Sequence, residues 1–206
     1  MNLQELKSCL EADLSKQVIT PGILLDHLRV INEDSRKTSA YVDPRYIPFY
    51  YYLGKYIQPK SMIEMGLGLA FFSTSFMKSC KTIEKLLAFQ ETSGEYYSAN
   101  LALKNIKSVY RGNVDYYEGT VNDILFQKYI SENKWDLVLI NEEYGYDKHM
   151  LHLDVAWSNL NADGYIVMDY INSFENAKRA FHNFCKIENR EPIILPTRYG
   201  VGIVQK

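Results

Sequence analysis

The 206-residue chain has few cysteines, and the three present lie far apart. Cys9, Cys80 and Cys185 are odd in number and show none of the close pairs that zinc-binding sequences use, so we expect reduced thiols. The sequence also lacks a signal peptide and any apolar run long enough to span a bilayer. These absences exclude a disulfide framework and favour a cytoplasmic location.

A strong excess of charge of either sign is missing as well. The formal net charge is −2, which gives no electrostatic reason to expect a nucleic acid or a membrane surface as partner. Internal repeats and low-complexity segments are absent. A hydrophobic content of 47% suits one globular core, and the length suits a single domain with a small amino-terminal addition.

Glycine is sparse, but two glycines lie close together in the stretch 61–73. Met62 and Ile63 are typical of the end of a buried strand, and Glu64 follows directly. Gly66 and Gly68 then allow a tight turn, before a helix that we expect to begin near residue 73. A strand, a glycine turn and a helix start together present free backbone N–H groups to a ligand. In a doubly wound sheet this place is the usual cofactor crevice.

The spacing argues against two common cofactor classes. Phe71 stands where the dinucleotide pattern G-x-G-x-x-G needs its third glycine, and no Gly-Lys-Ser/Thr follows for a phosphate loop. Glu64-x-Gly66-x-Gly68 instead resembles motif I of the class I S-adenosylmethionine (SAM)-dependent methyltransferases. The family's third glycine falls at Ala70, a small residue. An ordinary strand-to-helix turn remains the alternative interpretation of this stretch.

Helical patterns precede the first strand. Leucines at helical spacing predict an amphipathic helix over residues 2–16, Thr20-Pro21 begins a second helix, and a third runs from about residue 48 to 58. The resemblance implies an amino-terminal helical cap or lid segment, 1–45, and a methyltransferase domain, 46–206. The first helix could pack on its own domain or on a second subunit, which leaves a homodimer open.

The rest of the chain alternates strands with helices. Strands are predicted at 85–90, 114–119, 135–141 and 165–169. Two further strands, 192–196 and 199–204, are separated by only two residues and must therefore be antiparallel neighbours. We expect an α/β fold with a doubly wound, Rossmann-like, seven-stranded sheet, mostly parallel with a C-terminal antiparallel hairpin, and preceded by N-terminal helices.

The second half strengthens the resemblance. Residues 135–169 are similar to the region around strands four and five of small-molecule O-methyltransferases and the sugar-modifying enzymes related to them. Strand four of those relatives ends in Asp, with a His shortly after; here the two positions are Asn141 and Tyr144. The resemblance covers about residue 48 to the C-terminus.

The resemblance implies a site for SAM, with S-adenosylhomocysteine (SAH) as product, at the ends of four strands. A family acid at the end of strand two accepts the ribose hydroxyls; Gln90 holds that place, or Glu91 if the alignment slips by one residue, and both assignments stay open. Asn141 would lie beneath the transferable methyl group. The implied cofactor residues are Glu64, Gly66, Gly68, Gln90, Glu91, Thr120, Val121 and Asn141. For each, the alternative is a loop residue with a local role, and Thr120 in particular could cap a helix.

Catalytic residues are less clearly marked. Asp169, at the end of strand five, is the candidate base that orients the acceptor, because strand C-termini face the crevice. His149, after strand four, could reach the same place. Their alternatives are a turn-capping carboxylate and a surface histidine. Tyr144 and Tyr146 could stack on a ring or a sugar, and Tyr41 could close over the cofactor.

A divalent metal is not expected. Metal-dependent relatives use an Asp after strand four and an Asp-Asn pair after strand five. The corresponding residues are Asn141, Asp169 and Tyr170, which provide one carboxylate where a hard cation needs more.

The sequence therefore predicts a SAM-dependent methyltransferase that acts on a small-molecule acceptor, with a sugar or aromatic hydroxyl expected. A catalytically degenerate binding or partner protein of the same fold is the alternative, because several departures fall in the crevice. A nicotinamide-dependent oxidoreductase is a third hypothesis, and both Phe71 and the terminal hairpin argue against it. The sequence does not identify the acceptor.

Overall fold

The computed structural model describes residues 1–15, 46–91, 99–142, 145–197 and 199–206. The second predicted helix, at Thr20-Pro21, lies outside the described residues. The helices are α1 (Leu3–Ser15), α3 (Tyr46–Ile57), α4 (Phe71–Met77), α5 (Ala99–Val109), α6 (Ile124–Ser131), α7 (Tyr146–Asn159) and α8 (Glu175–Ile187). The strands are β1 (Ser61–Met65), β2 (Lys85–Gln90), β3 (Val114–Glu118), β4 (Trp135–Ile140), β5 (Leu160–Met168), β6 (Ile193–Leu195) and β7 (Val201–Gln205).

The strands form one seven-stranded sheet in the order β3-β2-β1-β4-β5-β7-β6. The first five strands in the chain pair in parallel, whereas β7 is antiparallel to both of its neighbours, β5 and β6. The predicted fold class is thus confirmed, including the reversed C-terminal hairpin. The strand order changes direction between β1 and β4, which makes that boundary the topological switch point.

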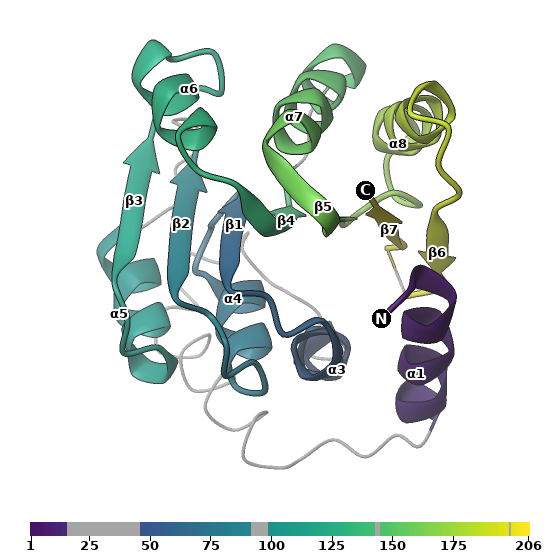
Figure 1. Cartoon of the computed structure of the whole chain (residues 1–206), viewed down its shortest axis with the longest axis horizontal. Helices are drawn as coiled ribbons and strands as arrows, with labels where there is room; N and C mark the ends of the chain where they lie inside the picture. Colours follow the sequence, from purple (N-terminus) through teal and green to yellow (C-terminus); the bar gives the residue numbers. More distant parts are fainter. Residues whose placement is uncertain (16–45, 92–98, 143–144, 198) are drawn as a thin grey trace.

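Helices cover both faces of the sheet (Figure 1). α3, α4 and α5 lie on one face, α6, α7 and α8 lie on the other, and α1 lies beside α3 and β6. The two faces bury separate hydrophobic clusters. The central strands are apolar on both sides, as parallel strands between two helical layers must be. This arrangement leaves the strand C-termini as the edge where polar side chains can gather.

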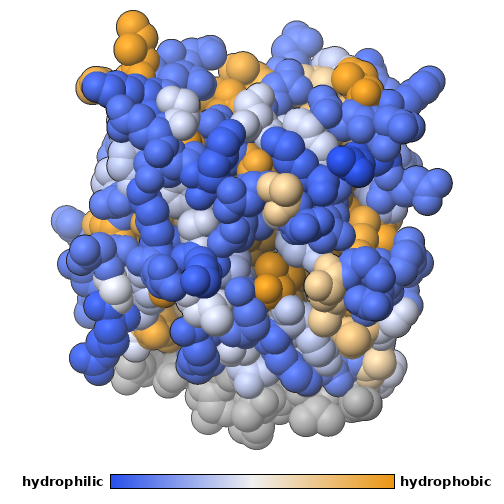
Figure 2. All heavy atoms as spheres, in the orientation of Figure 1, coloured by the Kyte–Doolittle hydropathy of each residue, from blue (hydrophilic) through white to orange (hydrophobic). Residues whose placement is uncertain are grey.

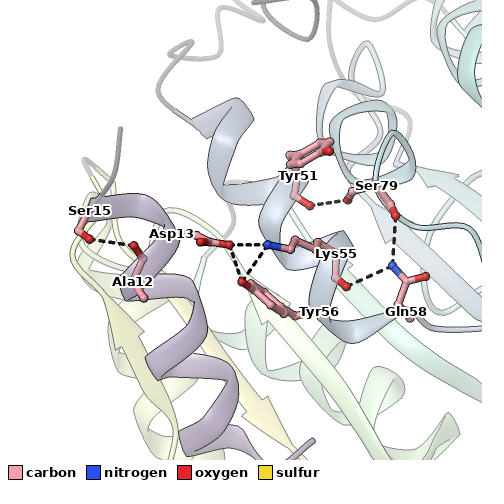
Figure 3. A network of polar contacts seen from close by, with 8 residues as sticks. All are labelled: Ala12, Asp13, Ser15, Tyr51, Lys55, Tyr56, Gln58 and Ser79. Carbon is pink, nitrogen blue, oxygen red and sulfur yellow. Dashed lines mark hydrogen bonds and ion pairs between the residues drawn. The ribbon is translucent and has the colours of Figure 1, made fainter. Parts of the chain in front are cut away.

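The predicted first helix is confirmed, and it packs on its own domain. Leu6 and Leu10 are fully buried in the same cluster as α3 and α4. At the other end of the helix, Asp13 accepts hydrogen bonds from Lys55 Nζ, at 2.7 Å, and from the Tyr56 hydroxyl, both on α3 (Figure 3). Because residues 16–45 lie outside the described part of the chain, the proposed boundary at 45 stays a prediction.

Several element boundaries differ from the prediction, and two of the differences concern strands next to candidate site residues. β1 continues through Met65, so Glu64 lies inside the strand and not after it. α7 ends at Asn159 and passes directly into β5, five residues before the predicted start. The β4–β5 register shifts between the pairs Trp135–Leu160 and Leu137–Tyr165, which absorbs the extra residues as an irregularity.

The face in Figure 2 is mainly hydrophilic, and its hydrophobic residues form separate small groups. Scattered exposed apolar residues of this kind are normal in globular proteins. In the described part of the chain, no helix combines the length and the apolarity needed to cross a membrane.

Candidate functional site

The candidate site lies at the switch point, where the C-terminal ends of β1 and β4 meet. Backbone hydrogen bonds extend the sheet one residue past the strands: Asn141 N–H donates to Met65 O at 2.8 Å, and Gly66 N–H donates to Phe89 O at 3.1 Å. These backbone hydrogen bonds hold the residue after β4 to the end of β1, and the residue after β1 to the end of β2. The spacing of functional side chains at this edge is set by the sheet itself.

The two glycines after β1 have different surroundings. Gly66 has φ +89°, and a Cβ there would overlap Asn141 O and Glu142 Cγ. Gly68 has φ +50°, and no atom of the described residues lies within 4 Å of the position of its Cβ. Glycine is thus required at Gly66 by close packing on β4, while Gly68 presents bare main chain to open space. Ala70, the family's third glycine position, adopts a left-handed φ of 59° and is fully buried.

Glu64 joins the glycine turn to the following helix. Its carboxylate is fully buried and accepts a hydrogen bond from the Ser73 hydroxyl on α4. Burial raises the pKa of Glu64 to about 8, and the bond from Ser73 opposes that rise. The structure therefore places Glu64 under the turn, where it holds α4 to β1. Contact with a ligand stays a prediction for this residue.

Gln90 and Glu91, the two alternatives at the end of β2, point to different partners. Gln90 is half-buried, and its Oε1 accepts the Gly68 N–H at 2.9 Å. Glu91 is 8% exposed and forms an ion pair with Lys148 of α7 at 2.6 Å. Gln90 is therefore the residue that faces the glycine turn, while the charge of Glu91 is paired with a lysine.

Asn141 and Glu142 follow β4 and lie over the turn. Asn141 Nδ2 donates to Gly66 O at 3.3 Å, and its buried Oδ1 accepts no hydrogen bond from the described residues. Glu142 Oε1 accepts a hydrogen bond from Gln90 Nε2 at 3.3 Å. Burial, and after it the nearby charge of Glu91, raise the pKa of Glu142 to about 8. A buried acceptor without a partner is uncommon in folded proteins and marks a place where a ligand can donate.

Asp169 follows β5 at the same edge and is 2% exposed. Its carboxylate accepts the Tyr170 N–H at 2.7 Å and the Tyr50 hydroxyl at 3.4 Å. Burial raises the pKa of Asp169 to about 7, against these two hydrogen bonds. Tyr170 has a left-handed φ of 62°, and its ring lies 5.4 Å from that of Tyr199 before β7. An acid with this pKa is suited to proton transfer near neutral pH.

Thr120 and Val121 have local roles in the structure. The Thr120 N–H donates to Asp123 Oδ2 at 2.8 Å, and its hydroxyl donates to Asp123 Oδ1 at 3.2 Å. Asp123 is the N-cap residue of α6, so this turn shapes the helix start. The Val121 side chain is buried in the hydrophobic cluster of that face. Contact of these two residues with the cofactor stays a prediction, and Val121 could make it only through its main chain.

Of the four other predicted residues, the structure describes two, both on α7. His149 is fully buried on α7, where burial lowers its pKa to about 4, so the surface alternative is wrong and the imidazole is neutral at pH 7. Tyr146 contacts α8, since its hydroxyl accepts from Asn183 Nδ2 at 3.0 Å and Arg179 lies over its ring. Tyr144 and Tyr41 lie outside the described residues.

The structure adds two side chains to the assigned cofactor and catalytic residues. Tyr50 of α3 reaches Asp169 across 119 positions of sequence, and its place in an apolar helix stripe signals only core packing. Glu142 follows strand four as one of two adjacent acids, a pattern equally typical of a solvated loop. Among the described residues, no three His, Cys, Asp or Glu side chains gather as a metal site.

Solved structures of low sequence identity share this fold. The sequence matches no protein-family model and no curated protein sequence. An O-methyltransferase from Bacillus cereus in complex with SAH is similar, with a TM-score of 0.72, 13% identity, and 98% and 100% of the two chains covered. An SAH-bound methyltransferase from Podospora anserina has a TM-score of 0.67 and 14% identity, with 99% of this chain and 96% of that one covered.

A third structure is the O-methyltransferase TomG from Streptomyces achromogenes in complex with SAM, with a TM-score of 0.68, 12% identity, and 100% of this chain and 98% of that one covered. These similarities extend over whole chains. The chain has the fold of the class I SAM-dependent methyltransferases.

Proposed function

We propose that this protein is a SAM-dependent O-methyltransferase that acts on a small-molecule hydroxyl. The observation that carries the proposal is the turn at Gly66 and Gly68, which presents open main chain at the switch point of a methyltransferase sheet. The similarity to O-methyltransferases crystallised with SAM or SAH supports the same cofactor here. A titratable acid, Asp169, lies at the same edge.

The residues of the crevice fit SAM. Gly68 has open space where a side chain would project, so a ligand can approach its backbone. The buried Oδ1 of Asn141 can accept a hydrogen bond from the ligand's amino group. When bound, SAM supplies a methyl group activated by its positive sulfur. Gln90, Asn141 and the glycine turn would hold the cofactor, which leaves the protein to position the acceptor.

Asp169 is the residue that we assign to the acceptor hydroxyl. With a pKa of about 7, it is partly ionised at neutral pH and can take the hydroxyl proton at a carboxylate oxygen. The Tyr50 hydroxyl and the Tyr170 N–H fix the carboxylate orientation. Tyr170 is the next residue in the chain, and its ring pairs with that of Tyr199, which favours a planar acceptor over a sugar.

Titration calorimetry with SAM, SAH and NAD tests the cofactor assignment. We expect saturable binding of SAM and SAH and none of NAD. Binding of NAD alone would overturn the proposal, because the turn would then serve a dinucleotide.

Turnover tests the reaction. Transfer of labelled methyl from SAM should be detected with at least one member of a panel of aromatic and sugar hydroxyl compounds. Tight SAH binding without transfer to any of them would favour a binding or partner protein with a degenerate site.

A further inference from the structure

The acids near the ends of β2 and β3 already have partners within the protein. Mononucleotide-binding sheets place an acid at the end of the second strand, where it accepts a ribose hydroxyl. Here β2 ends in Gln90, and the charge of its neighbour Glu91 is paired with Lys148. Glu118, at the end of β3, accepts the Tyr116 hydroxyl at 2.7 Å on the exposed edge strand. The second strand therefore offers no unpaired carboxylate among its described residues.

A carboxylate nevertheless lies at the end of β2. Glu142 comes from the residues after β4, and its Oε1 accepts a hydrogen bond from Gln90 Nε2 at 3.3 Å. The same Gln90 amide accepts the Gly68 N–H through Oε1 at 2.9 Å. One amide thus connects the carboxylate of Glu142 to the open glycine turn.

Resting on the SAM-dependent function proposed above, we infer that Glu142 is the acid that recognises the ribose diol of the cofactor, with Gln90 as its positioning residue. Glu142 is half-buried, so part of this residue is accessible to solvent. Gln90 has used both ends of its amide on Gly68 and Glu142, which leaves Glu142 as the stronger acceptor for a ligand hydroxyl. The acid missing from the end of β2 is then replaced by an acid that follows β4, the strand on the other side of β1.

The test uses the affinity ratio between SAH and its 2′-deoxy analogue, measured by calorimetry on the full chain. Burial and the charge of Glu91 raise the pKa of Glu142 to about 8, while the charge of Lys148 opposes the rise. The titrations are therefore run at pH 8.5, where the carboxylate is mostly ionised. The wild type should prefer SAH by about 10- to 100-fold, the value of one hydrogen bond to a charged group. In Glu142→Gln the ratio should fall below about threefold.

A matched control is Glu132→Gln, which removes the same charge from an exposed position at the end of α6 and should keep the wild-type ratio. The inference is overturned if Glu142→Gln keeps the ratio, or if Glu91→Gln or Glu118→Gln abolishes it instead. If Glu142→Gln does not fold, Glu142→Asp, which retains the charge, must show a reduced but measurable preference. Failure of the wild type to bind SAH at all would instead count against the proposed function.

Discussion

At the scale of single residues, the glycine turn contains two positions with opposite constraints. Gly66 is enclosed by the backbone of Asn141, whereas Gly68 faces open space. Sequence spacing treats the two glycines alike, so only the structure separates a packing role from a ligand role. The difference can be measured by substituting each position in turn.

Gly68→Asn should weaken SAH binding by roughly tenfold or more, because overpacking a filled contact costs about 1–3 kcal/mol. Stability should change little, since asparagine tolerates a left-handed φ and meets no neighbouring atom. Gly66→Ala should instead destabilise the fold by about 2 kcal/mol, through overlap with Asn141 O. Calorimetry and urea denaturation measure the two effects. Unchanged SAH affinity in Gly68→Asn would show that the ligand does not approach this backbone.

Asp169 provides a second prediction at this scale. Asp169→Asn keeps the shape and the Tyr170 N–H bond but cannot accept a proton, so turnover should fall by about 100-fold, typical of a lost general base. The SAH dissociation constant should change by less than about threefold, because the assigned contact is to the acceptor. The pH profile of kcat/KM in the wild type should rise through about 7. An unaltered profile in the variant would remove Asp169 from the reaction.

At the scale of elements, the contact between α1 and α3 joins the first segment to the domain. Asp13 is 8% exposed, while the Lys55 side chain is 48% exposed. A half-exposed ion pair contributes little because water and salt screen it, whereas a hydroxyl that donates to a buried carboxylate contributes more. Of the two partners, Tyr56 should therefore hold α1 more strongly than Lys55.

Tyr56→Phe removes only the hydroxyl and should lower the free energy of unfolding by about 1.5 kcal/mol. Lys55→Met keeps the aliphatic stem and should lower the free energy of unfolding by no more than about 0.5 kcal/mol. This loss relative to the wild type should vanish in high salt. Urea denaturation at two salt concentrations measures both. A larger effect for Lys55→Met would mean that charge, rather than the Tyr56 hydrogen bond, anchors α1.

The accuracy of sequence reasoning also differs between elements. β2 was predictable to the residue, because an apolar run of strand length lies between charged and polar neighbours. The start of β5 was not, since Leu160–Gly164 contains polar residues and pairs irregularly with β4. In the candidate site, the glycine turn and Asp169 follow from local spacing. The contacts Asp169–Tyr50 and Glu142–Gln90 join distant strands and helices, and no local pattern marks them.

At the scale of the whole molecule, several buried groups titrate near neutrality. The pKa values of Glu64, Glu142 and Asp169 are raised by burial, to about 8, 8 and 7. Burial lowers the pKa values of His149 and His152 to about 4 and 3. The crevice therefore contains acids whose charge is disfavoured in the folded state, a cost that a ligand able to donate hydrogen bonds would reduce.

The pH dependence of stability follows from these shifts. Above the unfolded pKa of an acid, about 4.5, the native state holds protons that the unfolded chain has released, so each raised acid makes stability fall as pH rises toward 8. The two histidines act in the opposite direction, but only below pH 6.5, where the unfolded chain gains protons that the native state refuses. Among the described groups with shifted pKa values, the acids dominate between pH 6.5 and 8.5, so the unliganded protein should lose stability on the order of 3 kcal/mol, or roughly 5–10 °C in Tm. Glu64→Gln should flatten this decrease, and thermal melting across the range measures it. A Tm that is constant or rises from pH 6.5 to 8.5 would mean that these carboxylates are solvated in the unliganded protein.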